Sequence, residues 1–280
     1  MKFNRLATIT ALSATMLGTS IQAFANEEEP KPSKEARTVI TDGEVRFSST
    51  GEDGEGEDTI TNPPAPGPDV TIPPVPGPDG GNKGPLTIAY VPTMNFGSQI
   101  ISNQDQQYSM LAEMQQKTGT TGETNKVPYV SFAEVQDTRG SNAGWDLRVR
   151  LSDFTSSTQN NRLTGARITL RDPRIVYLGN NQANAPVSHA NNFVLEPGTG
   201  SVSVMNAIAT KGAGSSSVVW GNQAALDQQF ANPLIKDVRN DAIVLSVPGR
   251  TEKDATTYKS TLTWDLTALP GNNEPNPDDE

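Results

Sequence analysis

The chain has 280 residues, a formal net charge of −10, no cysteine and a single histidine. Without cysteine it has no disulfide framework and no lipobox cysteine for a lipid anchor, so its core alone must stabilise it. The acidity lies mainly toward the ends. Residues 27–80 hold thirteen acidic and four basic residues, whereas residues 81–270 hold fifteen acidic and sixteen basic ones. A nearly neutral central region argues against nucleic-acid binding, which needs a basic face.

Residues 1–25 have the pattern of an export signal. Lys2 and Arg5 supply positive charge, and a mostly apolar run from Leu6 to Leu17 follows them. Ala23-Phe24-Ala25 then provides the small-x-small pattern that a signal peptidase recognises. We expect cleavage before Asn26. Since no later stretch approaches the ~20 apolar residues of a membrane span, the mature chain is predicted to be secreted without a transmembrane segment.

Residues 26–83 are predicted to be a disordered, acidic and proline-rich linker. Phe47 is its one aromatic residue, and the segment holds too little apolar surface to offset the entropy of ordering. The acidic run 51–58 lacks EF-hand spacing, which favours a solvated linker over a calcium loop. A repeat follows at Pro63–Asp69 and Pro73–Asp79, and its clustered prolines favour an extended polyproline II spacer.

From residue 84 to residue 272 the sequence predicts an all-β domain, sandwich-like with Greek-key or Ig-like topology, followed by an acidic tail at 273–280. Short apolar alternations separated by Gly, Asn, Asp and Pro are typical of such folds. The expected strands are 86–91, 127–136, 144–151, 165–171, 174–178, 201–205, 242–247 and 256–266. Helices are an alternative at 105–116 and 224–230, although the first of these also alternates with period two.

Two of the expected strands contain the tripeptide Trp-Asp-Leu, whereas the third tryptophan, Trp220, does not fit the pattern. Because strand side chains alternate, each motif places Trp and Leu on one face and Asp146 or Asp265 on the other. The apolar members are Trp145, Leu147, Trp264 and Leu266. A tryptophan on an apolar strand face is usually a core residue. The alternative is that these faces line a groove where aromatic rings stack on sugars.

Asp137-Thr138-Arg139-Gly140 lies between two expected strands. Arg139 could bridge to a carboxylate and fix a turn in which Gly140 adopts a positive φ. It could instead offer its guanidinium to an anionic wall polymer or a peptide carboxylate. The turn chemistry of Asp-x-Arg-Gly favours the first interpretation.

The ordered motifs of residues 84–270 resemble those of WxL-domain cell-surface proteins of Gram-positive bacteria. The quoted elements are Gly84-Pro-Leu-Thr-Ile88, Val91-Pro92, Asn95-Phe-Gly97, Asp137-Thr-Arg-Gly140, Gly144-Trp-Asp-Leu-Arg-Val149, Gly165-Ala-Arg-Ile-Thr-Leu170, Tyr258-Lys-Ser-Thr-Leu-Thr-Trp-Asp-Leu266 and Pro270. The resemblance implies a non-catalytic domain that binds the cell wall non-covalently, usually through peptidoglycan. It also implies association with other WxL proteins and membrane-anchored partners in complexes linked to adhesion, with host matrix as a further partner.

Competing functions find little support in the residues. Leu269-Pro270-Gly271 begins like a sortase signal but lacks the following Thr-Gly, so covalent anchoring is not expected. His189 stands beside two asparagines and is interpreted as a solvated loop residue, with no triad around it. The glycine- and serine-rich stretch 212–217 looks like a loop and lacks a phosphate-binding fingerprint. One alternative to wall retention is an adhesion or assembly module that binds other surface proteins or host matrix, with purely structural Trp-Leu motifs. A second alternative is a secreted glycan hydrolase that uses two carboxylates. We expect no cofactor, metal or catalytic residue.

Overall fold

The protein is described by a computed structural model at residues 45, 61–64, 67–73 and 84–269. The predicted signal peptide, the acidic run 51–58, most of the second proline repeat and the tail lie outside the described residues. Contacts divide the chain into residues 1–45 and 46–280, and everything below concerns the second unit.

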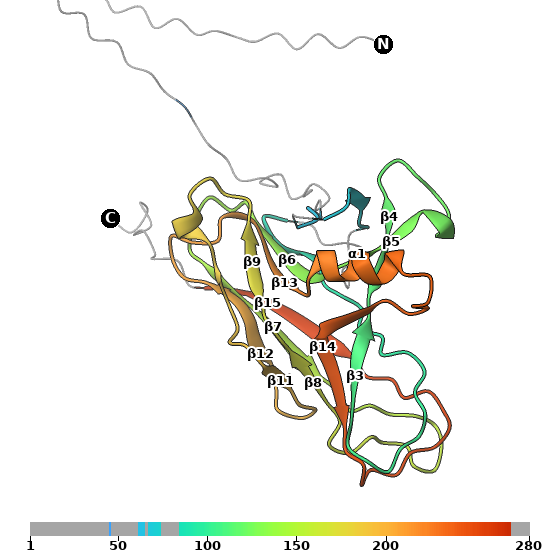
Figure 1. Ribbon diagram of the computed structural model, residues 1–280. Helices are drawn as coiled ribbons and strands as arrows, with labels where there is room; N and C mark the ends of the chain where they lie inside the picture. Colours follow the sequence, from blue (N-terminus) through green and yellow to red (C-terminus); the bar gives the residue numbers. More distant parts are fainter. Residues whose placement is uncertain (1–44, 46–60, 65–66, 74–83, 270–280) are drawn as a thin grey trace, which may run out of the picture. The chain divides into compact units, whose positions relative to one another are not determined.

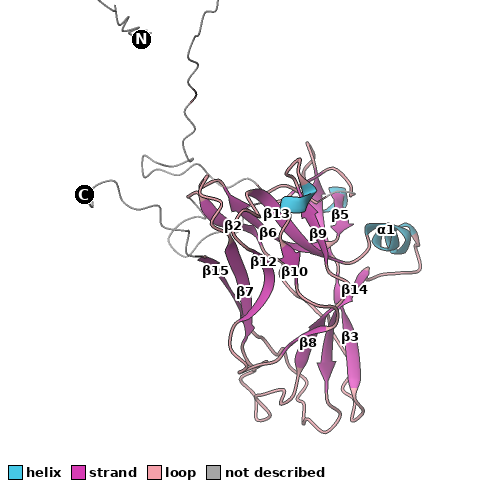
Figure 2. Ribbon diagram, turned by 90° about the vertical axis from the view of Figure 1, so that its left-hand side faces the viewer, coloured by secondary structure: helices cyan, strands magenta, loops and turns pink. Residues whose placement is uncertain are grey.

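Antiparallel strands dominate the described residues and form four sheets, each named here after a central strand (Figures 1 and 2). The β7 sheet has the order β10 (Val187–Ser188), β12 (Val202–Ala207), β7 (Trp145–Leu151) and β15 (Leu262–Ala268). The β14 sheet has the order β11 (Phe193–Leu195), β8 (Arg167–Leu170), β14 (Arg239–Val247) and β3 (Gln106–Leu111). The β6 sheet has the order β2 (Leu86–Tyr90), β6 (Ser131–Asp137), β13 (Gly214–Trp220) and β9 (Arg174–Tyr177). The β4 sheet has the order β1 (Val70–Thr71), β4 (Glu113–Lys117) and β5 (Lys126–Tyr129).

The prediction of an all-β fold is confirmed. Within the described residues the helical elements are α1 (Gln223–Ala231) and two single turns, η1 (Glu123–Asn125) and η2 (Gln182–Asn184). Asn222 caps α1, since its Oδ1 accepts a hydrogen bond from the backbone N–H of Ala225. Four separate sheets do not establish the two-layer sandwich, which stays a prediction.

Three predicted elements differ in detail from the observed ones. The ambiguous stretch 105–116 is extended and forms β3 and β4, because its alternation buries Met110 completely. The expected single strand 127–136 is two strands, β5 and β6, which belong to different sheets. The stretch 212–217, interpreted as a loop, contains the first half of β13, which pairs with β6 on one side and β9 on the other.

The larger hydrophobic core is built by the β7, β14 and β6 sheets. Its largest fully buried side chains include Trp145, Leu147, Ile168, Leu170, Met205, Trp220 and Ile243. A second, smaller core lies around the β4 sheet and α1, where the rings of Tyr90 and Phe132 stack with centroids 4.5 Å apart. Leu226 of α1 is buried in this second core.

Part of the predicted linker is packed on the domain. Tyr129 donates a hydrogen bond of 2.6 Å from its hydroxyl to the carbonyl of Pro64. Val70 and Ile72 are buried in the second core, and β1 pairs with β4. A side chain at Gly67 would meet the ring of Tyr129 at 2.8 Å, so only glycine fits there. The folded unit therefore includes residues 61–64 and 67–73, ahead of the boundary predicted at residue 84.

Candidate functional site

The two Trp-Asp-Leu motifs lie side by side, because β7 and β15 pair antiparallel. Leu147 stands opposite Leu266, Val149 opposite Trp264, and Trp145 opposite Ala268. In an antiparallel pair, opposed residues point to the same face. The four apolar motif residues therefore share one face of the sheet and pack against the larger core.

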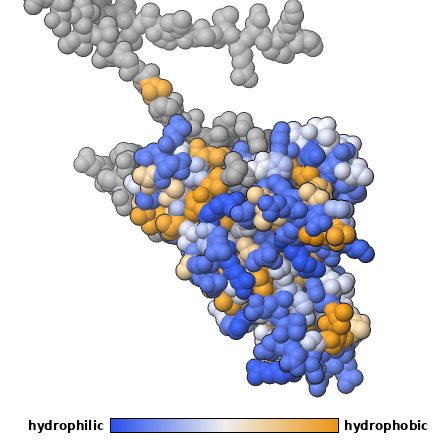
Figure 3. All heavy atoms as spheres, viewed as in Figure 1, coloured by the Kyte–Doolittle hydropathy of each residue, from blue (hydrophilic) through white to orange (hydrophobic). Residues whose placement is uncertain are grey.

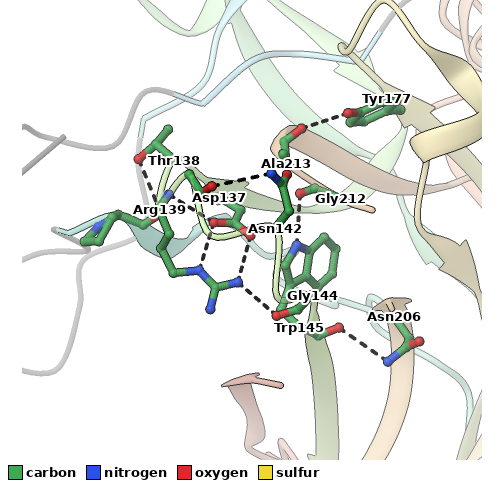
Figure 4. Close-up of polar contacts among 12 residues, drawn as sticks. Asp137, Thr138, Arg139, Asn142, Gly144, Trp145, Tyr177, Asn206, Gly212 and Ala213 are labelled. Atoms are coloured by element: carbon green, nitrogen blue, oxygen red, sulfur yellow. Dashed lines mark hydrogen bonds and ion pairs between the residues drawn. The ribbon is translucent and has the colours of Figure 1, made fainter. Parts of the chain in front are cut away.

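Trp145 is a core residue whose indole is fully enclosed (Figure 4). Its Nε1 donates a hydrogen bond of 3.0 Å to the carbonyl of Gly212. Gly212 has a φ of 75°, and a Cβ there would lie 2.4 Å from the Cβ of Ala207 and 2.8 Å from the indole nitrogen. The preceding Gly144 has a φ of 86°, and a Cβ there would lie 2.3 Å from the carbonyl oxygen of Ala207. Two glycines thus allow the backbone to close around this indole.

Arg139 fixes the turn that leads into the first motif (Figure 4). Its Nε and Nη2 donate to the two carboxylate oxygens of Asp137 at 2.9 and 2.8 Å, and Nη2 also donates to the carbonyl of Gly144 at 2.9 Å. Gly140 has a φ of 74° in this turn. The hydrogen bonds with Asp137 raise the pKa of the Arg139 guanidinium. These are the contacts that the turn-fixing interpretation expected, and they engage the guanidinium inside the protein.

The second motif is less enclosed than the first. Among the described strands β15 pairs with β7 alone, so it is an edge strand of its sheet. Trp264 and Leu266 are half-buried against the larger core, and Asp265 is exposed. The two tryptophans therefore have different surroundings, although both belong to the same apolar face.

The opposite face of the two strands is polar. Arg148 forms an ion pair of 3.1 Å with Asp146 and donates to the carbonyl of Ser201 at 2.6 Å. The hydroxyl of Ser203 donates to Asp146, and that of Ser201 donates to Asp265 at 3.3 Å. Both motif aspartates are thus tied to neighbouring strands, and their role as polar contacts for a ligand stays a prediction.

His189 differs from the solvated loop residue that we expected. It follows β10 and is half-buried. The indole Nε1 of Trp220 donates to its Nε2 at 2.8 Å, and its Nδ1 lies 2.7 Å from the carbonyl of Ala190. Because Nε2 accepts, the neutral ring carries its proton on Nδ1. Burial lowers the pKa of His189, which favours this neutral form.

Two carboxyl groups that the sequence did not single out are held inside the protein. Glu113 Oε1 accepts from the hydroxyl of Tyr90 at 2.9 Å and from the backbone N–H of Thr93 at 3.0 Å. Glu134 accepts from the backbone and side-chain nitrogens of Asn62 at 2.9 and 3.1 Å. Burial raises the pKa of each carboxyl to about 7. Neither carboxyl lines the cleft between residues 93–101 and 253–260, and neither do Trp145 and Trp264.

Across residues 61–64, 67–73 and 84–269, no three His, Asp or Glu side chains gather into a group that could hold a metal ion. Among the helices described, none is long and apolar enough to cross a membrane.

Comparison with known proteins gives one match. The family model described as "WxL domain surface cell wall-binding" matches residues 34–270, and this confirms the family resemblance of the sequence motifs. No curated protein and no solved structure matches the chain significantly. The family match spans both Trp-Asp-Leu strands, the buried Trp145 and the segment around Asn62 that packs on Glu134.

Proposed function

Since the chain belongs to the WxL family of surface cell wall-binding domains, we propose that it is a non-catalytic bacterial surface protein held non-covalently on the wall. The observation that carries this proposal is the family match over residues 34–270, which includes every described strand. The proposed ligand is peptidoglycan, the main polymer of a Gram-positive wall.

Further parts of the proposal follow from the sequence. Residues 1–25 direct export and are removed, and the domain retains the protein outside the cell. The Trp-Asp-Leu strands belong to a sandwich-like arrangement in which the β7 and β14 sheets face each other. The partners are the wall, other WxL proteins and a membrane-anchored surface protein.

The enclosure of Trp145 supports a structural role for the first motif. A fully buried indole that already donates its N–H to Gly212 has no free face for a sugar. Trp145 therefore contributes to wall binding by building the domain, and the wall contacts another surface of it.

A second candidate function is an assembly or adhesion module that binds other surface proteins or host matrix. Large hydrophobic side chains at the end of α1 favour it, since Phe230 and Leu234 are 49% and 88% exposed and Ile235 stands beside them. Exposed apolar patches mark interaction sites when they are contiguous.

A wall-pelleting assay tests the proposed function. The purified protein is mixed with isolated Gram-positive cell walls stripped of teichoic acids, and the bound fraction is measured as the protein concentration rises. Saturable pelleting that soluble peptidoglycan competes away is the expected result. Protein that stays in the supernatant contradicts wall binding. Release of sugar fragments from the walls would instead support the hydrolase alternative.

A further inference from the structure

A cleft of the domain is lined by two loops, residues 93–101 ahead of β3 and residues 253–260 ahead of β15. Its volume is about 830 Å³. This falls in the range of about 300–1,000 Å³ that is usual for sites of small ligands. In Figure 1 the first loop is the teal segment at the right, between β2 and β3.

The floor of this loop cleft is apolar and comes from two of the sheets. Tyr108 of β3, Ile168 of β8 and Leu245 of β14 belong to the β14 sheet, whereas Leu151 and Leu262 belong to the β7 sheet. The last two stand opposite each other where β7 ends and β15 begins. The floor is therefore fixed by regular strands, and loops form the walls.

The rim of the loop cleft is polar and also carries an exposed isoleucine. Ser98, Thr256 and Thr257 are exposed and line it. Ile100 is 89% exposed on the same loop as Ser98. In Figure 3 hydrophobic surface interrupts the hydrophilic surface at the lower right, where the loops gather. A ligand with both apolar and hydroxyl-rich faces matches this lining.

Two of the three charged residues that line the cleft are engaged within the protein. The ammonium of Lys253 donates to the carbonyls of Thr251, Ser102 and Pro248 at 2.6, 3.1 and 3.2 Å. The carboxylate of Asp254 accepts from the backbone and side-chain nitrogens of Asn160 at 2.8 and 2.7 Å. These hydrogen bonds lower the pKa of Asp254, so it stays ionised. The third, Lys259, is exposed, and its ammonium has no hydrogen-bond or ion-pair partner within the described residues, so the rim keeps one free cation.

We propose that the loop cleft binds the glycan strand of the wall, a chain of N-acetylated hexosamines, in preference to the peptide stems. This inference rests on the proposed function, because it names the surface through which the domain holds peptidoglycan. The apolar C–H faces of the sugar rings pack on the partly exposed side chains of Tyr108 and Leu262 and on Ile100. Their hydroxyl and acetamido groups exchange hydrogen bonds with the side chains of the rim.

Four variants test the cleft. Thr257→Arg places a long charged side chain on its rim, and Ile100→Ser removes the exposed apolar contact. Thr121→Arg adds the same charge on the exposed turn between β4 and β5, outside the cleft. Ile208→Ser removes the same apolar side chain at a position that is 58% exposed and also lies outside the cleft.

Binding is measured to stripped cell walls, to uncharged oligomers of β-1,4-linked N-acetylglucosamine as the free glycan, and to soluble stem peptides. The wild type is expected to bind walls and free glycan but not stem peptides. The double variant Thr257→Arg/Ile100→Ser should bind walls and free glycan about tenfold or more weakly, with an unchanged melting temperature. The two control variants should bind as the wild type does.

Three results overturn the inference, and they separate its failure from that of the proposed function. If the wild type and the double variant bind walls equally, the cleft is not the site, although wall binding stands. Binding to stem peptides and not to free glycan shows that the ligand class is wrong. If the wild type binds no wall at all, the proposed function fails together with the inference.

Discussion

Replacing Trp145 by phenylalanine tests whether the first motif is a core element. Phenylalanine keeps most of the ring but removes the indole N–H, so the buried carbonyl of Gly212 loses its donor at 3.0 Å. An unsatisfied buried acceptor costs about 1–3 kcal/mol. The lost ring volume, taken as about 40 Å³, adds about 1 kcal/mol. We therefore expect Trp145→Phe to lower the free energy of unfolding by about 2–4 kcal/mol.

The matched comparison is Trp264→Phe. The indole of Trp264 is half-buried on an edge strand and donates no hydrogen bond within the described residues. Its replacement should therefore cost about 1 kcal/mol or less. Urea unfolding followed by far-UV circular dichroism measures both values without using tryptophan fluorescence. A loss below 1 kcal/mol at Trp145, or an equal loss at both positions, would refute the reasoning.

Three further predictions concern the surroundings of the motif. Gly212→Ala should lower the free energy of unfolding in urea by about 3 kcal/mol, because it adds a clash with Trp145 to the strain of a positive φ. Gly198→Ala, at a φ of 83° with open space around it, should lower it by about 1 kcal/mol. Equal losses at the two positions would contradict the close approach of Gly212 to the indole. Arg139→Lys should lower the free energy of unfolding by about 1–2 kcal/mol, because a lysine cannot donate to both carboxylate oxygens of Asp137 at once. The melting temperature should fall accordingly, and an unchanged melting temperature would contradict this prediction. Burial raises the pKa of Glu134 to about 7 in the folded protein, so the folded state binds the carboxyl proton more tightly than the unfolded state does. This protonation contributes up to about 3 kcal/mol to the free energy of unfolding below pH 4.5, and the contribution is lost as pH rises through 7. Glu134→Gln should therefore flatten the fall in the free energy of unfolding between pH 4.5 and 8, and an unchanged slope would count against it.

The all-β class could be predicted because most core strands alternate clearly. In β7, Trp145, Leu147, Val149 and Leu151 alternate with polar residues, and all four are buried. The register that brings the two motifs together could not be predicted, because it depends on which strands pair across more than a hundred residues. The sequence indicated only that the Trp and Leu of each motif lie on one side of their strand, so that the two motifs could share a face of a sheet.

The missed elements share a physical cause. Gly214 to Ser217 has the composition of a loop, yet it is extended because β6 and β9 satisfy its backbone hydrogen bonds on both sides. Val70 and Ile72 stand isolated among prolines, and their burial depends on a surface supplied by β4 and β5. The partner of His189 is Trp220, which comes from another sheet. Tertiary contacts, which no local pattern encodes, decided each case.

The geometry of β7 connects the buried motif with the proposed wall site. Trp145 lies at one end of this strand and Leu151 at the other, where it stands opposite Leu262 on the floor of the loop cleft. The pairing of Leu147 with Leu266 holds the two strands in register between these ends. A change in the core at Trp145 can therefore move the cleft floor without any tryptophan touching the wall. Loss of wall binding in a Trp145 variant together with lowered stability fits this route, whereas loss without any change in stability would require direct contact between the indole and the ligand.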